Sequence, residues 1–92
     1  MSELRQQVTI VNKRGLHARA SAKFVGAVAE LPDTTQVFVA KDGNKAGGGS
    51  ILGLMMLGAA KGDEVELIVS GDNAPETLSS LVAMVEDGFG ED

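Results

Sequence analysis

Residues 64–71, "EVELIVSG", alternate between hydrophobic and polar side chains. Val65, Leu67 and Val69 alternate with Glu64, Glu66 and Ser70. A period of two is typical of a β-strand that buries one face and leaves the other in water. Residues 6–11, "QQVTIV", repeat the pattern with Val8 and Ile10 on the hydrophobic face. Because both strands keep a polar face, we predict an antiparallel sheet with its helices on a single face.

Three other segments have helical features. Within residues 18–31, hydrophobic side chains recur at helical spacing, and Pro32 follows. Residues 51–58 form a short apolar segment after Ser50, which is a good N-cap. A third helix is predicted to begin at Asn73, where Glu76 would complete a capping box, and to end at Gly88.

Two more strands are predicted at residues 35–41, "TQVFVAK", and 44–48. An Asp-Gly turn between them predicts a hairpin, although the glycines of the second segment disfavour a strand. The element order is then β-α-β-β-α-β-α, an α+β fold. We expect residues 1–92 to form a single domain, because a chain of this length supports one core and no linker interrupts it.

The composition excludes several classes of protein. There is no cysteine, and hence no disulfide or thiolate metal site. A net charge of -5, with no Trp or Tyr, argues against nucleic-acid binding. The longest apolar run, residues 51–60, is too short to cross a bilayer, and the first residues lack the apolar region of a secretory signal. We therefore expect a cytoplasmic protein without membrane insertion.

The single histidine, His17, precedes the first predicted helix. At the N-cap or in the first turn it lies beside backbone N–H groups that have no intrahelical partner, and such groups bind anions. A neutral imidazole has a free lone pair and can form a covalent intermediate, and Arg19 could bind phosphate oxygens. The sequence thus favours a phosphohistidine at a helix N-terminus. On position alone, the alternative is a histidine that ends a turn and faces water.

The surroundings of His17 separate these possibilities only in part. Four basic residues gather near it in the sequence: Lys13, Arg14, Arg19 and Lys23. They predict a positive patch on an acidic protein, or simply a solvated charged surface. No metal site or other cofactor is predicted, because one histidine without cysteines leaves only carboxylates as further ligands.

Two motifs together resemble the family of histidine-containing phosphocarrier proteins, HPr, of the phosphoenolpyruvate-dependent phosphotransferase system. They are "GLHARASAKFV" (15–25) and "SILGLMMLGAAKGDEVEL" (50–67). The resemblance rests on Gly15, Leu16, His17 and Arg19 in the first motif, and on Ser50, Gly58, Lys61 and Gly62 in the second. It implies an open-faced β-sandwich in which three helices cover a four-stranded antiparallel sheet. Most of the family has proline where this chain has Ala20.

The resemblance also implies roles for particular residues. His17 would accept a phosphoryl group from enzyme I and pass it to IIA-type domains, with Arg19 helping to hold it. Ser50 would match a regulatory serine that an HPr kinase/phosphorylase modifies. In the apolar helix, Leu54 and Leu57 would face the sheet, and the partner-binding residues would be Ile51, Leu52 and Met55.

These roles describe a monomeric phosphoryl carrier with a transient phosphohistidine and not an enzyme with its own small-molecule substrate. The alternative is a regulatory protein of the same fold, as in the nitrogen-related branch of the phosphotransferase system. There, phosphorylation state would signal to partner proteins and would not drive sugar uptake.

Overall fold

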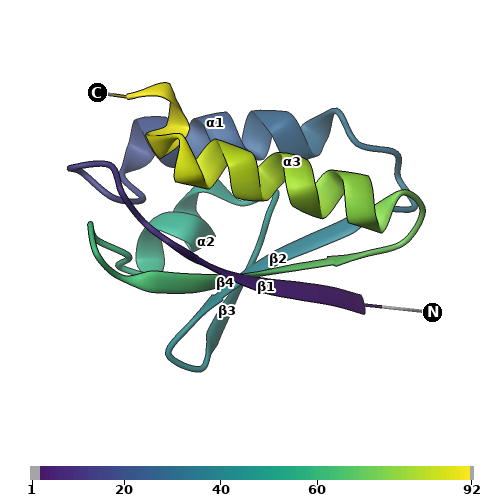
Figure 1. Cartoon of the computed structure of the whole chain (residues 1–92), viewed down its shortest axis with the longest axis horizontal. Helices are drawn as coiled ribbons and strands as arrows, with labels where there is room; N and C mark the ends of the chain where they lie inside the picture. Colours follow the sequence, from purple (N-terminus) through teal and green to yellow (C-terminus); the bar gives the residue numbers. More distant parts are fainter. Residues whose placement is uncertain (1–2, 92) are drawn as a thin grey trace.

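A computed structural model describes residues 3–91. The elements follow the predicted order, and a short 3-10 turn, η1, comes after the last helix (Figure 1). They are β1 (Glu3–Thr9), α1 (Ala18–Ala29), β2 (Gln36–Lys41), β3 (Asn44–Gly47), α2 (Ile51–Met56), β4 (Glu64–Ser70), α3 (Ala74–Glu86) and η1 (Gly88–Gly90). The α+β class and the open-faced β-sandwich are confirmed.

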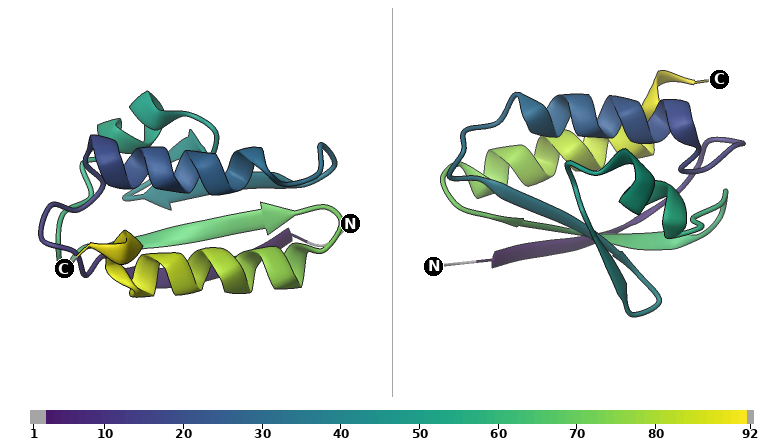
Figure 2. Two further views of the ribbon diagram at one scale, coloured as in Figure 1. Left: turned by 90° about the horizontal axis from the view of Figure 1, so that it is seen from above. Right: turned by 180° about the vertical axis from the view of Figure 1, so that it is seen from behind.

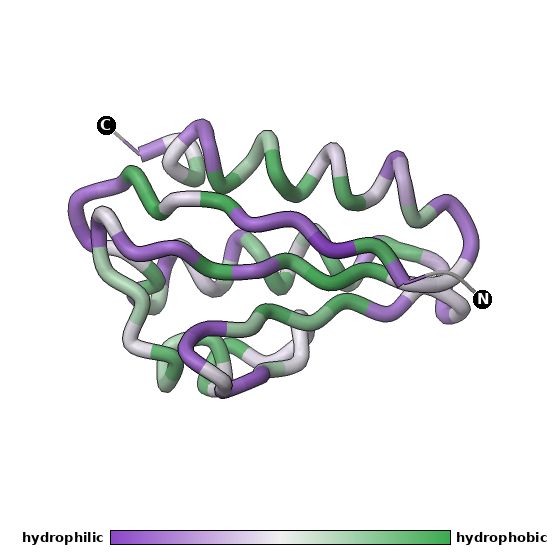
Figure 3. The backbone as a smooth tube through the Cα atoms, turned by 60° about the horizontal axis from the view of Figure 1, so that its bottom comes forward, coloured by the Kyte–Doolittle hydropathy of each residue, from purple (hydrophilic) through white to green (hydrophobic). Residues whose placement is uncertain are grey.

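The four strands form one antiparallel sheet in the order β1-β4-β2-β3. β4 is central, so Val65 pairs with Val8 of β1 while Leu67 pairs with Val39 of β2. The colouring by hydropathy shows hydrophobic and hydrophilic residues alternating over the first part of β4, whereas β2 is hydrophobic over most of its length (Figure 3). Alternation of this kind gives the sheet one apolar face and one polar face.

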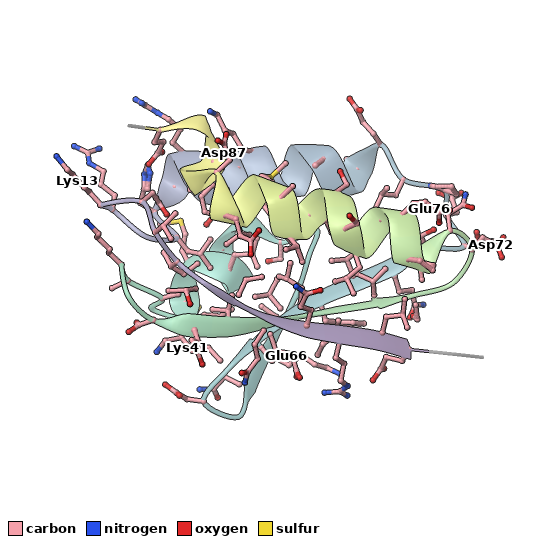
Figure 4. The ribbon with its side chains drawn as sticks, viewed as in Figure 1. Lys13, Lys41, Glu66, Asp72, Glu76 and Asp87 are labelled. Atoms are coloured by element: carbon pink, nitrogen blue, oxygen red, sulfur yellow. The ribbon has the colours of Figure 1, made fainter. Side chains whose placement is uncertain are left out.

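The helices cover the apolar face of the sheet. α1 and α3 lie side by side, and α2 packs against α1 on its other side (Figure 2). The core between the layers includes Phe24 of α1, Leu54 of α2, Leu67 of β4 and Val85 of α3, each at most 2% exposed. On the opposite, polar face, Glu66 extends outward and pairs with Arg5 at 2.9 Å (Figure 4). The expectation of helices on a single face is confirmed.

The predicted bounds of the first strand, residues 6–11, were wrong at both ends. β1 starts at Glu3, because it pairs with β4 along its whole length, from Glu3 opposite Ser70 to Thr9 opposite Glu64. Ile10 keeps the alternation, is buried and exchanges backbone hydrogen bonds of 2.8 Å with Asp63 and Gly62, but those two residues form the turn before β4 and not part of the strand. The hairpin strand with the weakest support, residues 44–48, is confirmed as β3 over Asn44–Gly47.

The capping box at Asn73 was also wrong. Asn73 has a left-handed backbone with φ 60°, and its side chain makes no capping hydrogen bond. A capping box needs an extended N-cap residue whose side chain reaches back over the first turn. The first turn of α3 instead contains Pro75, whose missing N–H costs nothing at that position. α3 ends at Glu86, two residues before the predicted Gly88.

Among residues 3–91, no helix is both long enough and apolar enough to span a bilayer. The same residues contain no group of three or more His, Asp or Glu side chains that could hold a metal ion.

Candidate functional site

His17 is the N-cap residue of α1, as the sequence predicted. Its backbone is extended, with φ -77° and ψ -178°, and its carbonyl accepts the N–H of Ser21 at 2.9 Å. The N–H of Arg19 donates to the ring atom Nδ1 at 3.4 Å. The helix start therefore turns Nδ1 toward its own first turn, where backbone N–H groups lack intrahelical partners.

The turn before His17 is fixed by close contacts of its backbone. Gly15 has φ 64°, and a Cβ atom there would overlap the carbonyl oxygen of Ala59. That oxygen accepts the N–H of Leu16 at 3.0 Å, and the carbonyl of Gly15 accepts Nδ2 of Asn12 at 2.9 Å. Only glycine fits both the left-handed backbone and the close approach. The turn thus holds His17 against the loop that follows α2.

Basic side chains surround the imidazole. Lys13, Arg14, Arg19 and Lys23 line one shallow pocket together with His17. Lys13 extends from the turn before α1, toward the same end of the molecule as Asp87 at the close of α3 (Figure 4). The positive patch predicted from the sequence is confirmed. Together with the positive end of the α1 dipole, it makes the pocket suitable for an anion.

The other ring nitrogen of His17 contacts a carboxylate. Nε2 lies 2.6 Å from Oε2 of Glu91, and Oε1 of Glu91 accepts Nδ2 of Asn12 at 3.0 Å. Burial raises the pKa of Glu91, but the hydrogen bonds from Asn12 and His17 outweigh it and hold that pKa below its usual range. An ionised carboxylate only accepts hydrogen bonds, so the ring proton is on Nε2. The lone pair of a neutral His17 is then on Nδ1, which faces the helix N-terminus.

Sequence reasoning missed Asn12 and Glu91. Glu91 reaches His17 because the chain turns back after α3 through three residues with positive φ: Gly88, Phe89 and Gly90. Phe89 is 2% exposed, and its carbonyl accepts Nζ of Lys23 at 2.7 Å. Contacts across 74 residues leave no periodic pattern in the sequence. The one signal was a phenylalanine between two glycines, which indicates a turn with a buried anchor.

The second motif forms a separate surface. Ser50 is exposed and is the N-cap of α2, where its Oγ accepts the N–H of Gly53 at 2.9 Å. Leu54 is fully buried and Leu57 packs against the core, which confirms the inner arc predicted for this helix. The outer arc is exposed: Ile51 by 40%, Leu52 by 67%, Met55 by 40% and Met56 by 77%. Ser50 does not line the pocket around His17.

Comparison with known proteins shows which family this chain resembles. The sequence pattern described as "PTS HPr component phosphorylation site" matches residues 4–87. The chain is 42% identical over 88 residues to the phosphocarrier protein HPr of Neisseria meningitidis, covering 96% of this chain and 97% of the relative. It is 36% identical to the phosphocarrier protein NPr of Shewanella violacea, covering 99% and 98%.

A solved structure agrees with both sequence matches. A crystal structure of HPr from Thermoanaerobacter tengcongensis superposes with a TM-score of 0.86 at 39% identity. The match covers 100% of this chain and 99% of the solved one. Fold and sequence therefore point to the same family.

Proposed function

The chain belongs to the HPr family of the phosphotransferase system, and we propose that it carries a phosphoryl group on Nδ1 of His17. The observation that carries this proposal is the contact of Nε2 with Glu91 at 2.6 Å, because it leaves the lone pair on Nδ1. The group would come from phospho-enzyme I and pass to IIA-type domains. The protein would act as a carrier that is regenerated in each cycle and not as an enzyme.

The transfer step needs little besides this geometry. The Nδ1 lone pair attacks phosphorus, an N–P bond forms, and the bond between phosphorus and the donor atom breaks. The phosphoryl oxygens would meet the free N–H groups of the first turn of α1 and the guanidinium of Arg19. Arg19 is exposed, so its side chain can follow the phosphoryl group as it arrives and leaves.

We propose that partners bind the exposed arc of α2, with Ile51, Leu52 and Met55 as the contact residues. Exposed apolar side chains on one short helix form the kind of patch that protein partners cover. Met55 suits several partners, because its unbranched side chain adapts to different shapes. Ser50 begins the same helix, so phosphorylation by an HPr kinase/phosphorylase would add negative charge beside this patch. A cytoplasmic location and a monomeric state complete the proposal.

The regulatory branch is a second candidate, and the 36% identity to an NPr supports it. The chemistry at His17 is the same in the transport and the regulatory role. The protein that accepts the phosphoryl group distinguishes the two roles. Transfer from the phosphorylated chain to a sugar-specific IIA domain supports the transport role. Transfer that ends on a nitrogen-related IIA protein supports the regulatory role.

The test incubates the purified chain with phosphoenolpyruvate and enzyme I. We expect an acid-labile gain in mass that matches one phosphoryl group, with the modified residue identified as His17 by fragmentation. The variant His17→Ala should gain nothing. No gain by the wild-type chain, or an equal gain by His17→Ala, would contradict the carrier function.

A further inference from the structure

We propose that Glu91 is a positioning residue for phosphoryl transfer: it holds the proton on Nε2 of His17 and stabilises the imidazolium that forms when Nδ1 is phosphorylated. The inference rests on the proposed carrier function and adds a residue to it. Glu91 lies in the segment after α3, outside both motifs that relate the chain to its family.

The first step of the argument is that the structure fixes Glu91 in place. Three separate contacts hold the segment 88–91 over the start of α1: the buried ring of Phe89, the bond from Lys23 Nζ to the Phe89 carbonyl, and the bond from Asn12 Nδ2 to Glu91. Phe89 itself has φ 58°, which is unfavourable for a residue with a bulky side chain. A strained residue persists where surrounding contacts outweigh the strain, and such residues concentrate at functional sites.

The second step concerns the arrangement of hydrogen bonds around the carboxylate. Asn12 is 2% exposed and donates both to the Gly15 carbonyl in the turn before His17 and to Oε1 of Glu91. One amide group therefore links the backbone that positions His17 with the carboxylate that contacts its ring. Oε2 is left for Nε2, at 2.6 Å, which is short even for a hydrogen bond to an ionised group.

The third step is the charge balance of the reaction. A neutral imidazole that attacks through Nδ1 already has its proton on Nε2, so forming the N–P bond leaves a positively charged ring. No proton has to move, provided that Nε2 keeps its proton. The adjacent carboxylate favours that protonated ring, and a phosphoryl group on a positive ring also leaves more readily for the next acceptor. Glu91 would thus assist both the uptake and the release of the group.

The charges around His17 show what a carboxylate adds to this pocket. The other charged side chains that line the pocket are cations: Lys13, Arg14, Arg19 and Lys23. They attract the phosphoryl oxygens, but they repel a positive imidazolium. Glu91 is the one anionic side chain among the residues that line this pocket. Glu91 offsets this repulsion, because its carboxylate contacts Nε2 of the ring directly.

The test compares Glu91→Gln with the control Glu86→Gln. Glu86 is exposed at the end of α3, so the control removes the same charge from the same part of the chain without touching His17. Nitrogen-15 NMR of the unphosphorylated proteins reports which ring nitrogen has the proton, and rapid-quench kinetics report transfer from phospho-enzyme I. We expect wild type and Glu86→Gln to show the Nε2–H form alone. Glu91→Gln should show a mixture with Nδ1–H, and its transfer should be about tenfold slower, the usual effect of losing a hydrogen bond to a charged group.

The two readouts distinguish the ways in which this inference can fail. An unchanged tautomer and an unchanged transfer rate in Glu91→Gln would overturn the role of Glu91, while phosphorylation of the wild type would leave the carrier function intact. A wild-type chain that takes up no phosphate would overturn the carrier function. The tautomer is measured without phosphate, so it would still decide whether Glu91 positions the ring.

Discussion

Ala20 stands at the third position of α1, where the family resemblance predicts proline. Its side chain is fully buried, and within residues 3–91 its N–H has no hydrogen-bond acceptor. We therefore predict that this N–H donates to a phosphoryl group on His17, although Ala20 is closed to solvent in the unphosphorylated protein. Proline has no N–H, but it is tolerated in the first turn because that N–H is not needed by the helix.

The variant Ala20→Pro should therefore keep α1 and lose one donor to the phosphoryl group. We expect an unchanged far-ultraviolet circular dichroism spectrum and a phosphohistidine lifetime about tenfold shorter, since one hydrogen bond to a charged group is lost. Lifetimes follow from the decay of the phosphorylated mass after enzyme I is removed. Ala20→Gly keeps the N–H and should keep the lifetime. Equal lifetimes in wild type and Ala20→Pro would show that this donor does not contact the phosphoryl group.

Two residues of the site show which features the sequence predicts and which it does not. The N-cap position of His17 could be predicted, because a helical stripe begins directly after it and the family motif supports the same start. The role of Glu91 could not, since its contact with His17 depends on three consecutive residues with positive φ and on the burial of Phe89. Local patterns describe neighbours in the chain and not partners brought together by a turn.

Among the elements, α2 combines two functions in six residues. Leu54 anchors it in the core, while Leu52 and Met55 on its outer arc are exposed. Ser50 caps the helix through its Oγ, and the cap is expected to contribute about 1 kcal/mol relative to alanine. A charge at Ser50 would thus be compatible with the helix and unfavourable for an apolar partner surface.

We predict that Ser50→Asp binds enzyme I more weakly without losing stability. Aspartate is a good N-cap and its charge suits the helix N-terminus, so the free energy of unfolding in urea should stay within about 0.5 kcal/mol of wild type. Asparagine is nearly the same size, caps equally well and has no charge, so Ser50→Asn is the matched control and should bind normally. Ser50→Ala should lose about 1 kcal/mol of stability. Equal affinities for Ser50→Asp and Ser50→Asn, measured by calorimetry, would show that charge at this position does not regulate docking.

The elements were predictable in kind and less so in extent. Alternation identified β1 and β4, but the end of β1 depends on where its partner strand begins, which alternation cannot report. Asn73 and Glu76 have the spacing of a capping box, yet the chain enters α3 through a left-handed residue. Spacing shows that two residues could form a capping box. Whether they form it depends on the backbone conformation with which the preceding loop enters the helix.

At the scale of the whole molecule, helices on one face of the sheet bring distant segments to one end. The turn at residues 12–17, the loop containing Ala59 and the segment 88–91 meet there through backbone and side-chain hydrogen bonds. The one-sided sheet could be predicted from the polar faces of its strands. Which loops meet at its end could not, because that depends on the direction in which α3 returns toward the start of α1.

This convergence predicts how stability responds to acid. Because the pKa of Glu91 is lower in the folded protein than its ordinary value of 4.5, the unfolded chain binds a proton more tightly at this group. The stability that the Glu91 carboxylate contributes is therefore fully present above that ordinary value. It is lost as the pH falls through the lowered pKa of the folded state.

Urea unfolding across a pH series, from neutral to below the ordinary pKa of a glutamate, should show this dependence. Wild type should lose stability more steeply in acid than Glu91→Gln, and the two curves should converge at the lowest pH. Glu86→Gln should follow wild type, because Glu86 is exposed at the end of α3 and does not contact His17. Other carboxylates titrate in all three proteins and cancel in the comparison. Parallel curves for wild type and Glu91→Gln would mean that the 88–91 segment does not hold an ionised carboxylate against His17, and the explanation of the Nδ1 lone pair would fail with it.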